Sequence, residues 1–520
     1  MTASASFGVA QRNKLLSALL AGYAVVNEAD DCEIHGLSMD SRKVQAGDLF
    51  LACAGHMGHI GQQPRHGREF IADAIQAGAV AVAYAIDDEG AVTVFEDSVG
   101  AAVKVPMFGI ARLGQQAGAI AERFYDYPSR DLFVMGITGT NGKTSCSQFI
   151  AQALNEDAPA GVIGTLGNGL YGKLQEASHT TPDAISLHGL LAEMRAAGAT
   201  SVAMEVSSHG LEQGRVNGVA FDAAVFTNLS RDHLDYHGDM ISYGRAKQRL
   251  FSMAGLRYAI INADDSFGRE LLQSLPVDVA AIAYTLGDVE YVSCKQVVRG
   301  TLLSQGLDGL SLQVTSPWGE ACFTTRLLGR FNASNLLAVL ATLVVSGVPF
   351  GAAIQKLGRL QPVPGRMECY GGRHGKPLVV VDYAHTPDAL NQVLQSLREH
   401  CQNDLWVVFG CGGNRDRGKR PLMGEIAQRH ADHIVLTDDN PRHESADEII
   451  VDIRAGLRPS QSIHVERDRA QAIAWAVTRA TERDVVLIAG KGHENYQLIG
   501  DTAVTFSDST HVRNLLKEAA

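Results

Sequence analysis

Basic residues are scarce relative to acidic ones in this sequence, and the deficit limits what the chain can bind. Lys and Arg number 45 against 57 Asp and Glu, which gives a formal net charge of −12. Nonspecific nucleic-acid binding requires a basic face, so we expect no nucleic-acid partner. Long apolar runs are also missing: none reaches the roughly 18 residues that cross a bilayer, so we expect no membrane span.

Closely spaced cysteines are missing as well. The eight cysteines lie far apart, with no Cys-x-x-Cys pair and no Cys/His spacing typical of a metal centre. This pattern favours free thiols in a reducing compartment. The 520 residues contain no long low-complexity segment and no clear internal repeat, and 46% are apolar. We therefore expect an ordinary soluble protein of two to four domains.

The first apolar run, residues 15–26, has two interpretations. Arg12 and Lys14 precede it and small residues lie near its end, which resembles a short signal peptide. The alternative is an amphipathic helix with one apolar stripe, formed by Leu15, Leu16, Leu19 and Leu20. We favour the helix, because the nucleotide site described next implies a cytoplasmic protein.

The chain is organised around residues 131–154, which read DLFVMGITGTNGKTSCSQFIAQAL. The apolar run at 132–135 predicts a strand buried on both faces of a parallel sheet. Further on, apolar residues recur at helical spacing, at Cys146, Phe149, Ile150 and Leu154. A strand, a glycine-rich loop and a helix predict a nucleoside triphosphate site, because backbone N–H groups face the phosphates.

Two side chains of this loop have the chemistry that triphosphate binding needs. Lys143 supplies positive charge at the β- and γ-phosphate oxygens, and the Thr144 hydroxyl can ligate Mg²⁺. The common pattern G-x-x-x-x-G-K-[ST] is not met as written, because Ile137 occupies the position of its first glycine. A tight turn without function is the alternative, and the Lys-Thr pair argues against it.

Residues 111–361 predict further strands that end in polar residues. The strand at 201–206 carries Glu205, and a buried carboxylate is costly unless it is paired or bound to a metal. We therefore expect Glu205 to ligate Mg²⁺. The strand at 223–226 leads into TNLSRDHLDYH, whose acids and histidines suggest metal or phosphate contacts.

Two other regions also predict α/β structure. Residues 1–110 favour strands at 47–52 and 79–83, and Ser41 and the loop at His56 offer hydrogen-bond donors for a substrate. Residues 362–520 predict four strands that end in polar residues, at 378–381, 405–409, 433–436 and 485–489. Because ligands bind beyond the carboxyl ends of strands in open α/β sheets, we expect these four ends to share one crevice.

Six motifs, in one order, give the chain a resemblance to a known family. They are GITGTNGKTS, MEVSSHGL, FTNLSRDHLDYHG, GRFNASN, PGRME and DYAHTPDAL. In these motifs the chain resembles the Mur ligase family, from about Met39 to the last helix. The resemblance implies an α/β fold of three domains: a uridine-nucleotide domain at 1–110, a central P-loop ATP-binding domain with a mostly parallel sheet at 111–361, and a Rossmann-like amino-acid-binding domain at 362–520.

The resemblance also implies site residues. Those for the uridine nucleotide and muramoyl-dipeptide are Met39, Ser41, His56, Met57, Gly58, His179, Thr180, Thr181, Ser207, Gln213 and Arg215, although the family often has Asn at position 179. Those for ATP are Gly139, Thr140, Asn141, Gly142, Lys143, Thr144, Ser145, Asn332, Arg366 and Asp382. Those for Mg²⁺ are Thr144, Glu205, His233 and Lys247. Lys143, Lys247, Glu205 and His233 would be catalytic.

Lys247 has a special role in this resemblance, because it matches a lysine that CO₂ converts to a carbamate. An exposed helix lysine is the alternative that the sequence alone favours. The motifs TDDNPR and AGKGHE extend the resemblance to members that bind diaminopimelate, through Arg415, Asp439, Asn440, Pro441, Arg442, Gly490 and Glu494.

Arg442 bears on which amino acid is used. Diaminopimelate differs from lysine by one extra carboxylate, and the planar fork of an arginine suits a carboxylate. Pro441 fixes φ and stiffens the turn before it. The alternative is a surface arginine paired with Glu444.

The implied activity is amide formation in peptidoglycan precursor synthesis. The D-glutamate γ-carboxylate of UDP-MurNAc-L-Ala-D-Glu attacks the ATP γ-phosphorus, which gives an acyl phosphate and ADP, and the amine of meso-diaminopimelate then displaces phosphate. Phosphoryl transfer depends on positioning and electrostatics, so no nucleophilic triad is needed. A cytoplasmic monomer whose partners are these small molecules is expected.

Two competing functions start from the same nucleotide loop. A ligase similar to folylpolyglutamate synthetase would lack a dedicated uridine-nucleotide domain, and the first 110 residues argue against it. A nucleotide-driven switch or motor would hydrolyse ATP to change conformation. Phosphate release distinguishes them, since a ligase should need both its carboxylate and its amine substrate.

Overall fold

The computed structural model describes residues 13–55, 66–86, 105–177, 179–287, 294, 296–306, 309–399, 401–458 and 463–517. The chain forms two compact units. The first consists of the described residues of Met1–Thr138, Leu154–Ala224 and Ala246–Arg257. The second consists of those of Gly139–Ala153, Val225–Arg245 and Tyr258–Ala520. Short 3-10 helices lie at Glu28–Asp30, Ser41–Lys43, Gly67–Phe70, Pro128–Asp131 and Arg249–Ser252.

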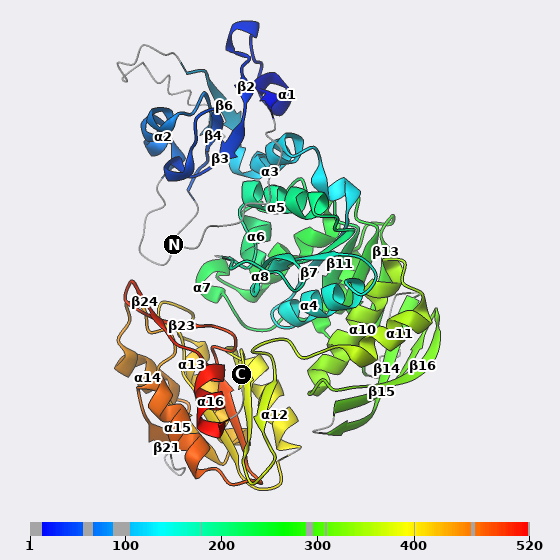
Figure 1. Ribbon diagram of the computed structural model, residues 1–520, viewed down its shortest axis with the longest axis vertical. Helices are drawn as coiled ribbons and strands as arrows, with labels where there is room; N and C mark the ends of the chain where they lie inside the picture. The colour runs from blue at the N-terminus through cyan, green and yellow to red at the C-terminus, as the bar shows by residue number, and fades with distance from the viewer. Residues whose placement is uncertain are drawn as a thin grey trace. The chain divides into compact units, whose positions relative to one another are not determined.

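A four-stranded parallel sheet near the N-terminus has the order β3-β4-β5-β6 (blue in Figure 1). Its elements are β3 (Gly36–Ser38), β4 (Asp48–Ala52), α2 (Ile71–Ala77), β5 (Ala81–Ile86), β6 (Met107–Ala111) and α3 (Leu113–Phe124). Side chains alternate across β4: Leu49 and Leu51 pack in the core with α3, whereas Phe50 packs in the core with α2. The strands predicted at 47–52 and 79–83 are confirmed.

The helix predicted at the first apolar run is shorter than expected. α1 spans Leu16–Leu20, and Leu15 belongs to β1 (Lys14–Leu15), which pairs antiparallel with β2 (Glu33–Ile34). Strand pairing turns Leu15 outward, where half of its surface is exposed, while Leu16, Leu19 and Leu20 lie in the core. The leucines therefore pack as part of the folded domain.

The P-loop strand lies in a parallel arrangement within the first unit. β7 (Phe133–Thr138) and β8 (Ala160–Gly164) each pair parallel with β10 (Ser201–Glu205), and β9 (Gly167–Leu170) pairs antiparallel with β8. Every residue of β8 and β10 is buried, which agrees with strands covered on both faces. Helices α5 (Ala184–Ala196) and α6 (Ser208–Glu212) flank β10 in sequence.

The second unit continues from the strand β11 (Ala223–Phe226), which spans the division between the units. β12 (Tyr258–Asn262), β13 (Ala280–Thr285) and β14 (Gln296–Gly306) are parallel neighbours. An antiparallel meander, not predicted from the sequence, adds β15 (Gly309–Ser316) and β16 (Gly319–Thr325). The helices before the C-terminal sheet are α4 (Lys143–Leu154), α7 (Leu234–His237), α8 (Met240–Gln248), α9 (Ser266–Ser274), α10 (Arg330–Val345) and α11 (Phe350–Arg359). Leu154 of α4 and residues 246–248 of α8 belong to the first unit.

The C-terminal sheet contains the four strands that the sequence predicts. Its order is β17-β18-β22-β19-β20-β21, and all pairs except β17–β18 are parallel. The strands are β17 (Glu368–Gly371), β18 (Leu378–Asp382), β19 (Leu405–Phe409), β20 (His433–Leu436), β21 (Ile463–Val465) and β22 (Val485–Ala489), with a separate hairpin of β23 (Tyr496–Ile499) and β24 (Thr502–Thr505).

Helices cover both faces of this sheet, as the yellow, orange and red ribbons of Figure 1 show. One face packs against α12 (Pro387–Arg398), α13 (Lys419–His430) and α14 (Ala446–Arg454). The other packs against α15 (Arg469–Arg479) and α16 (Asp508–Leu516). The predicted strands β18, β22, β19 and β20 are therefore adjacent, and their carboxyl ends meet at one edge.

Candidate active site

Two glycines shape the loop between β7 and α4. Gly139 has a φ of +147°, and a Cβ there would lie 1.9 Å from Oγ1 of Thr227. Gly142 has a φ of +87°, and its Cβ would lie 2.8 Å from Oδ1 of Asn335. Only glycine fits both the backbone conformation and the space. The loop therefore requires Gly139 and Gly142, although it lacks the first glycine of the common pattern.

The loop backbone is fixed by the segment that follows β11. The N–H groups of Thr140 and Asn141 donate to the carbonyl and side-chain oxygens of Asn228, at 2.8 and 2.9 Å. The hydroxyl of Thr140 also lies 3.2 Å from that of the buried Tyr243. These contacts hold the loop in one conformation and leave its anion-binding N–H groups at the start of α4.

Lys143 lies at the start of α4, and its side chain bonds to the loop that precedes the helix. Its Nζ donates to the carbonyl oxygens of Gly139 and Thr140, at 2.8 and 2.9 Å. Thr144 and Ser145 follow in the first turn and are buried. The predicted pair of a lysine and a hydroxyl is therefore positioned at a helix N-terminus, as a phosphate site requires.

The C-terminal domain contributes an arginine to the same loop. Nη2 of Arg366 donates a 3.0 Å hydrogen bond to the hydroxyl of Thr144, and its guanidinium stacks on the ring of Tyr383. Asp382, at the end of β18, accepts the backbone N–H groups of Met367 and Ala384. Burial raises the pKa of Asp382, although Arg366 opposes the shift.

Two more contacts extend the cluster around the loop. Asn332, in the first turn of α10, donates to the carbonyl of Leu328 at 2.7 Å and is buried. Asn141 donates to Oδ2 of Asp388 at 3.0 Å, in the first turn of α12. Asn141 therefore connects the loop with α12, and the ATP-binding roles of Asn332, Arg366 and Asp382 stay predictions.

His233 lies in a cluster of titratable groups, of which the sequence indicated Asp232 and His233 but not His385. Its Nε2 is 3.4 Å from Oδ2 of Asp232, and Nε2 of His385 is 3.8 Å from the same oxygen. Burial alone would raise the pKa of Asp232, but His233, Lys419 and His385 together hold it well below its usual range. Burial and then Lys419 lower the pKa of His385 to about 4. His385 belongs to the DYAHTPDAL motif, which was the available signal.

Glu205 is buried at the end of β10 and has hydrogen-bond partners there. Its two carboxylate oxygens accept the N–H and the hydroxyl of Thr165, at 2.8 and 3.1 Å. Gly164 makes room for it, since a Cβ at that position would lie 2.3 Å from Oε1. These bonds account for the burial of Glu205, so its role toward Mg²⁺ stays a prediction.

The residues predicted for the muramoyl-dipeptide gather beside Glu205. Thr181 donates to the carbonyl of Glu205 and accepts the N–H of Ser207, at 2.9 and 3.0 Å. Arg215 donates to the carbonyl of Thr181 and holds Oε1 of Gln213 with two of its nitrogens. Thr180 meets the Thr165 hydroxyl at 3.1 Å. This part of the candidate site is therefore a connected hydrogen-bond network.

His179 is affected by charges from this network and from the N-terminal domain. Burial lowers the pKa of His179, and the charges of Arg215 and Lys43 lower it further. Lys43 ends the 3-10 helix that starts at Ser41, and Met39 packs against the core of the same domain. His56, Met57 and Gly58 lie outside the described residues.

Lys247, near the end of α8, has only 1% of its surface exposed. The interpretation of an exposed helix lysine is therefore wrong. Hydropathy could not reveal this, because the neighbouring residues of α8 are mixed in character.

Beyond β20 and β22, two predicted diaminopimelate ligands, Asn440 and Glu494, form a hydrogen-bond network with Lys491, which was not predicted. Lys491 is fully buried, and its Nζ donates to Asn440 Oδ1 at 3.1 Å and Glu494 Oε2 at 2.7 Å. Asn440 donates to Glu494 at 2.9 Å. Gly490 has a φ of +115°, and its Cβ would lie 2.5 Å from Oδ2 of Asp439. Lys491 stands within the AGKGHE motif, which was the signal for it.

Arg415 and Arg442 bring two positive charges to the same place. A Cβ on Gly412 would meet Nη1 of Arg442 at 2.9 Å and Cγ of Arg415 at 3.8 Å. Burial and then the charge of Arg442 lower the pKa of Arg415. Arg442 follows Pro441 and has a φ of +52°, and its Nη1 donates to the carbonyl of Gly413 at 2.9 Å. Two guanidinium groups at one site suit a ligand with carboxylates.

Three further findings concern the described part of the chain. No group of three or more His, Cys, Asp or Glu residues there is arranged to hold a metal ion. None of its helices is long and apolar enough to cross a membrane. All eight cysteines are free thiols, as predicted.

Family models match most of the chain. "Mur ligase family, catalytic domain" matches residues 33–125, "Mur ligase middle domain" 137–343 and "Mur ligase, glutamate ligase domain" 365–492. The chain belongs to the Mur ligase family and is a ligase, and the resemblance inferred from its motifs is confirmed.

Two curated relatives and one solved structure share a name. A Coxiella burnetii protein is 48% identical over 94% of this chain and 96% of its own length, and a Pseudomonas aeruginosa protein is 48% identical over 92% and 94%. Both are named UDP-N-acetylmuramoyl-L-alanyl-D-glutamate--2,6-diaminopimelate ligase. A solved structure with that name is 35% identical over 97% of this chain and 99% of its own, with a TM-score of 0.66. MurF from Acinetobacter baumannii, 18% identical over 98% of this chain and 100% of its own, shares the fold with a TM-score of 0.62.

Proposed function

We propose that this protein joins meso-2,6-diaminopimelate to the D-glutamate γ-carboxylate of UDP-MurNAc-L-Ala-D-Glu, using ATP, in cytoplasmic peptidoglycan precursor synthesis. The name shared by its near-full-length relatives supports the reaction. The observation that carries the choice of amino acid is the meeting of Arg415 and Arg442 at Gly412. A substrate with two carboxylates complements that pair better than lysine does.

In this proposal the P-loop binds ATP, and its residues do three things. The backbone N–H groups of residues 139–145, apart from those of Thr140 and Asn141 that Asn228 accepts, bind phosphate oxygens. Lys143 leaves the loop carbonyls to neutralise charge at the γ-phosphate, and Arg366 approaches the same phosphates from beside Thr144. A γ-carboxylate oxygen forms a bond to the γ-phosphorus as the bond to the β-phosphate oxygen breaks. The amine then attacks the acyl carbon, phosphate leaves, and the amine loses a proton.

We propose Mg²⁺ as the metal that accompanies ATP in this site. Mg²⁺ keeps several waters and is often bound through one or two side chains plus substrate phosphates. The Thr144 hydroxyl, Glu205 and His233 are the proposed protein ligands, and the ion would neutralise charge on the phosphates. A carbamate on Lys247 would add a negative group, and its formation needs the neutral amine that burial favours.

We also propose the domain limits 1–110, 111–361 and 362–520 for the uridine-nucleotide, ATP and amino-acid domains. The three family models, at 33–125, 137–343 and 365–492, support boundaries close to these. We propose that the protein acts as a monomer on small-molecule substrates.

Phosphate release tests the proposed reaction class. Purified protein is mixed with ATP and Mg²⁺, and phosphate is measured with no substrate, with either substrate alone, and with both. We expect rapid release only when the UDP-MurNAc-dipeptide and diaminopimelate are both present. Equal release without them would instead support a nucleotide-driven switch.

A further inference from the structure

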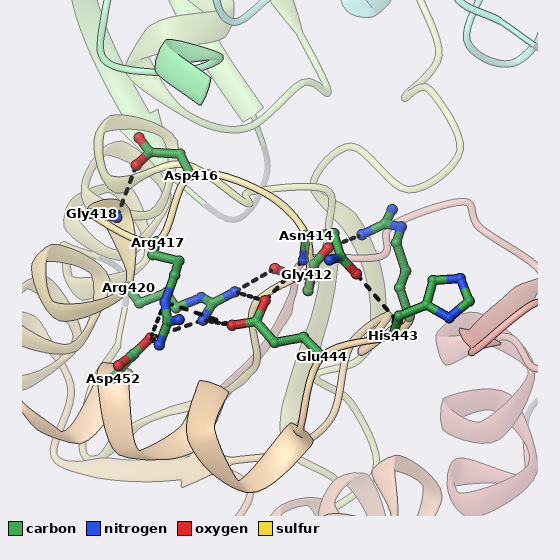
Figure 2. A network of polar contacts seen from close by, with 11 residues as sticks. Gly412, Asn414, Asp416, Arg417, Gly418, Arg420, His443, Glu444 and Asp452 are labelled. Atoms are coloured by element: carbon green, nitrogen blue, oxygen red, sulfur yellow. Dashed lines mark hydrogen bonds and ion pairs between the residues drawn. The ribbon is translucent and has the colours of Figure 1, made fainter. Parts of the chain in front are cut away.

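A buried arginine, Arg420, ties together the two loops that carry Arg415 and Arg442. It lies in the first turn of α13, and its side chain is fully buried. Nη1 and Nη2 donate to Oε1 and Oε2 of Glu444, each at 2.7 Å, in a two-pronged pair. Nη2 also donates to the carbonyl of Gly412 at 3.2 Å. Figure 2 shows this guanidinium beside the Glu444 carboxylate.

Glu444 connects Arg420 with the backbone of the loop at residues 412–416. Its Oε2 accepts the backbone N–H of Asn414 at 2.9 Å, so one carboxylate holds both Arg420 and the first loop. The N–H of Gly413 donates to the carbonyl of Asn440 at 2.9 Å, and Nη1 of Arg442 donates to the carbonyl of Gly413. Residues 412–416 and 440–444 are therefore fastened together by side-chain and backbone bonds.

A second acidic residue, Asp452, also accepts a hydrogen bond from Arg420. Asp452, on α14, accepts Nη1 of Arg420 at 2.9 Å and Nη2 of Arg417 at 3.0 Å, as Figure 2 shows. In the described part of the chain, the hydrogen-bond partners of the Arg420 side chain are Glu444, Asp452 and the carbonyl of Gly412. Neither Arg442 nor Lys491 is among them. Two of its partners, Gly412 and Glu444, belong to the loops themselves, so Arg420 would act on the substrate site through these loops.

We propose that Arg420 is a positioning residue for the amino-acid substrate, because its pair with Glu444 sets the separation of Arg415 and Arg442. This inference rests on the proposed function. Recognition of a second carboxylate requires donors held to within about 0.5 Å of the productive geometry. A lysine at position 420 keeps the positive charge but cannot form the two-pronged bond, so the two loops lose their shared anchor.

Steady-state kinetics of Arg420→Lys test this role. We expect KM for meso-diaminopimelate to rise about 10-fold or more, while KM for ATP and for the UDP-MurNAc-dipeptide changes less than about twofold. The preference for diaminopimelate over L-lysine, as a ratio of kcat/KM, should fall. A purely structural role would lower the amount of active enzyme, and hence kcat, without this substrate-specific change in KM.

Arg429→Lys is the matched control, because Arg429 lies on the same helix but pairs with Glu425 at an exposed position. It should leave all three KM values unchanged. Glu444→Gln is the second variant, which keeps the side-chain size and removes the charge; it should reproduce the selective rise and decides the matter if Arg420→Lys does not fold. An unchanged KM for diaminopimelate in the folded variant overturns the inference, whereas a parent enzyme that forms no product with diaminopimelate overturns the proposed function instead.

Discussion

Arg366 donates a 3.0 Å hydrogen bond to the hydroxyl of Thr144, from a position 222 residues further along the chain. Thr144 belongs to the nucleotide loop, whereas Arg366 precedes the first strand of the C-terminal sheet. The bond connects the segment that would bind triphosphate with the domain that would bind the amino acid. A phosphate group in the loop would compete for the same guanidinium, so nucleotide binding and the amino-acid domain are physically connected.

Lys143→Ala should lower kcat for ligation by about 100-fold or more, while the melting temperature stays close to that of the parent. The Nζ of Lys143 donates to the carbonyls of Gly139 and Thr140, so its positive charge lies at the loop that would bind the phosphates. Product formation is measured by chromatography at saturating ATP. Lys173→Ala, at an exposed turn, is the control and should be fully active. Near-normal turnover by Lys143→Ala would refute the role.

Lys247→Ala should be severely impaired, and a short carboxylic acid such as acetate should restore part of its activity. The reason is that the carbamate proposed on Lys247 is a carboxylate, and a small acid can enter the space that the missing side chain leaves. Activity is measured against acetate concentration, with chloride at equal ionic strength as the control. Intact-protein mass spectrometry under CO₂ checks the modification itself. Full activity of Lys247→Ala without additive would rule the carbamate out.

Arg442→Ala should lower kcat/KM for meso-diaminopimelate by about 30-fold or more, since losing one partner of a buried charge pair costs about 2–5 kcal/mol. The loss for L-lysine should be much smaller, because lysine lacks the second carboxylate. Both amino acids are compared on both proteins. Arg454→Ala, an exposed arginine of α14, serves as the control. Equal use of diaminopimelate by parent and variant would contradict this assignment.

Protonation of Glu444 should lower the stability of the protein in acid. Arg420 lowers the pKa of Glu444 from 4.5 to about 2, so the folded state binds its proton more weakly than the unfolded state. The stabilisation is therefore complete above about pH 5 and disappears as the pH falls through about 2. At pH 7, Glu444→Gln should reduce the free energy of unfolding by about 2 kcal/mol. Melting temperatures of parent and variant should converge toward pH 2, and a constant difference would show that charge is not the cause.

The strands and the nucleotide loop could be predicted from the sequence because their signals are local. Buried strands of four or five apolar residues end in polar clusters, and β11 and β19 have the bounds that the sequence indicates. Glycine, lysine and threonine have fixed places in the phosphate loop. The carboxyl ends of parallel strands must share an edge, so Asp439 and Glu494 could be assigned to one crevice before their positions were known.

Other features depend on packing between distant segments and left no local signal. Lys247 looks like a surface residue but is buried. Arg442 does not pair with Glu444, as the alternative interpretation required, because Glu444 is already bound by Arg420. The antiparallel strands β15 and β16 carry mixed residues with one exposed face, which weakens the apolar pattern.

Mass spectrometry of the reaction product tests the central claim most directly. The protein is incubated with ATP, Mg²⁺, UDP-MurNAc-L-Ala-D-Glu and an equimolar mixture of meso-diaminopimelate and L-lysine, and the UDP-linked products are identified by mass. The account predicts a single main product that carries diaminopimelate, formed with one ADP per molecule. A main product that carries lysine, or ADP formed without any amino-acid adduct, would contradict it.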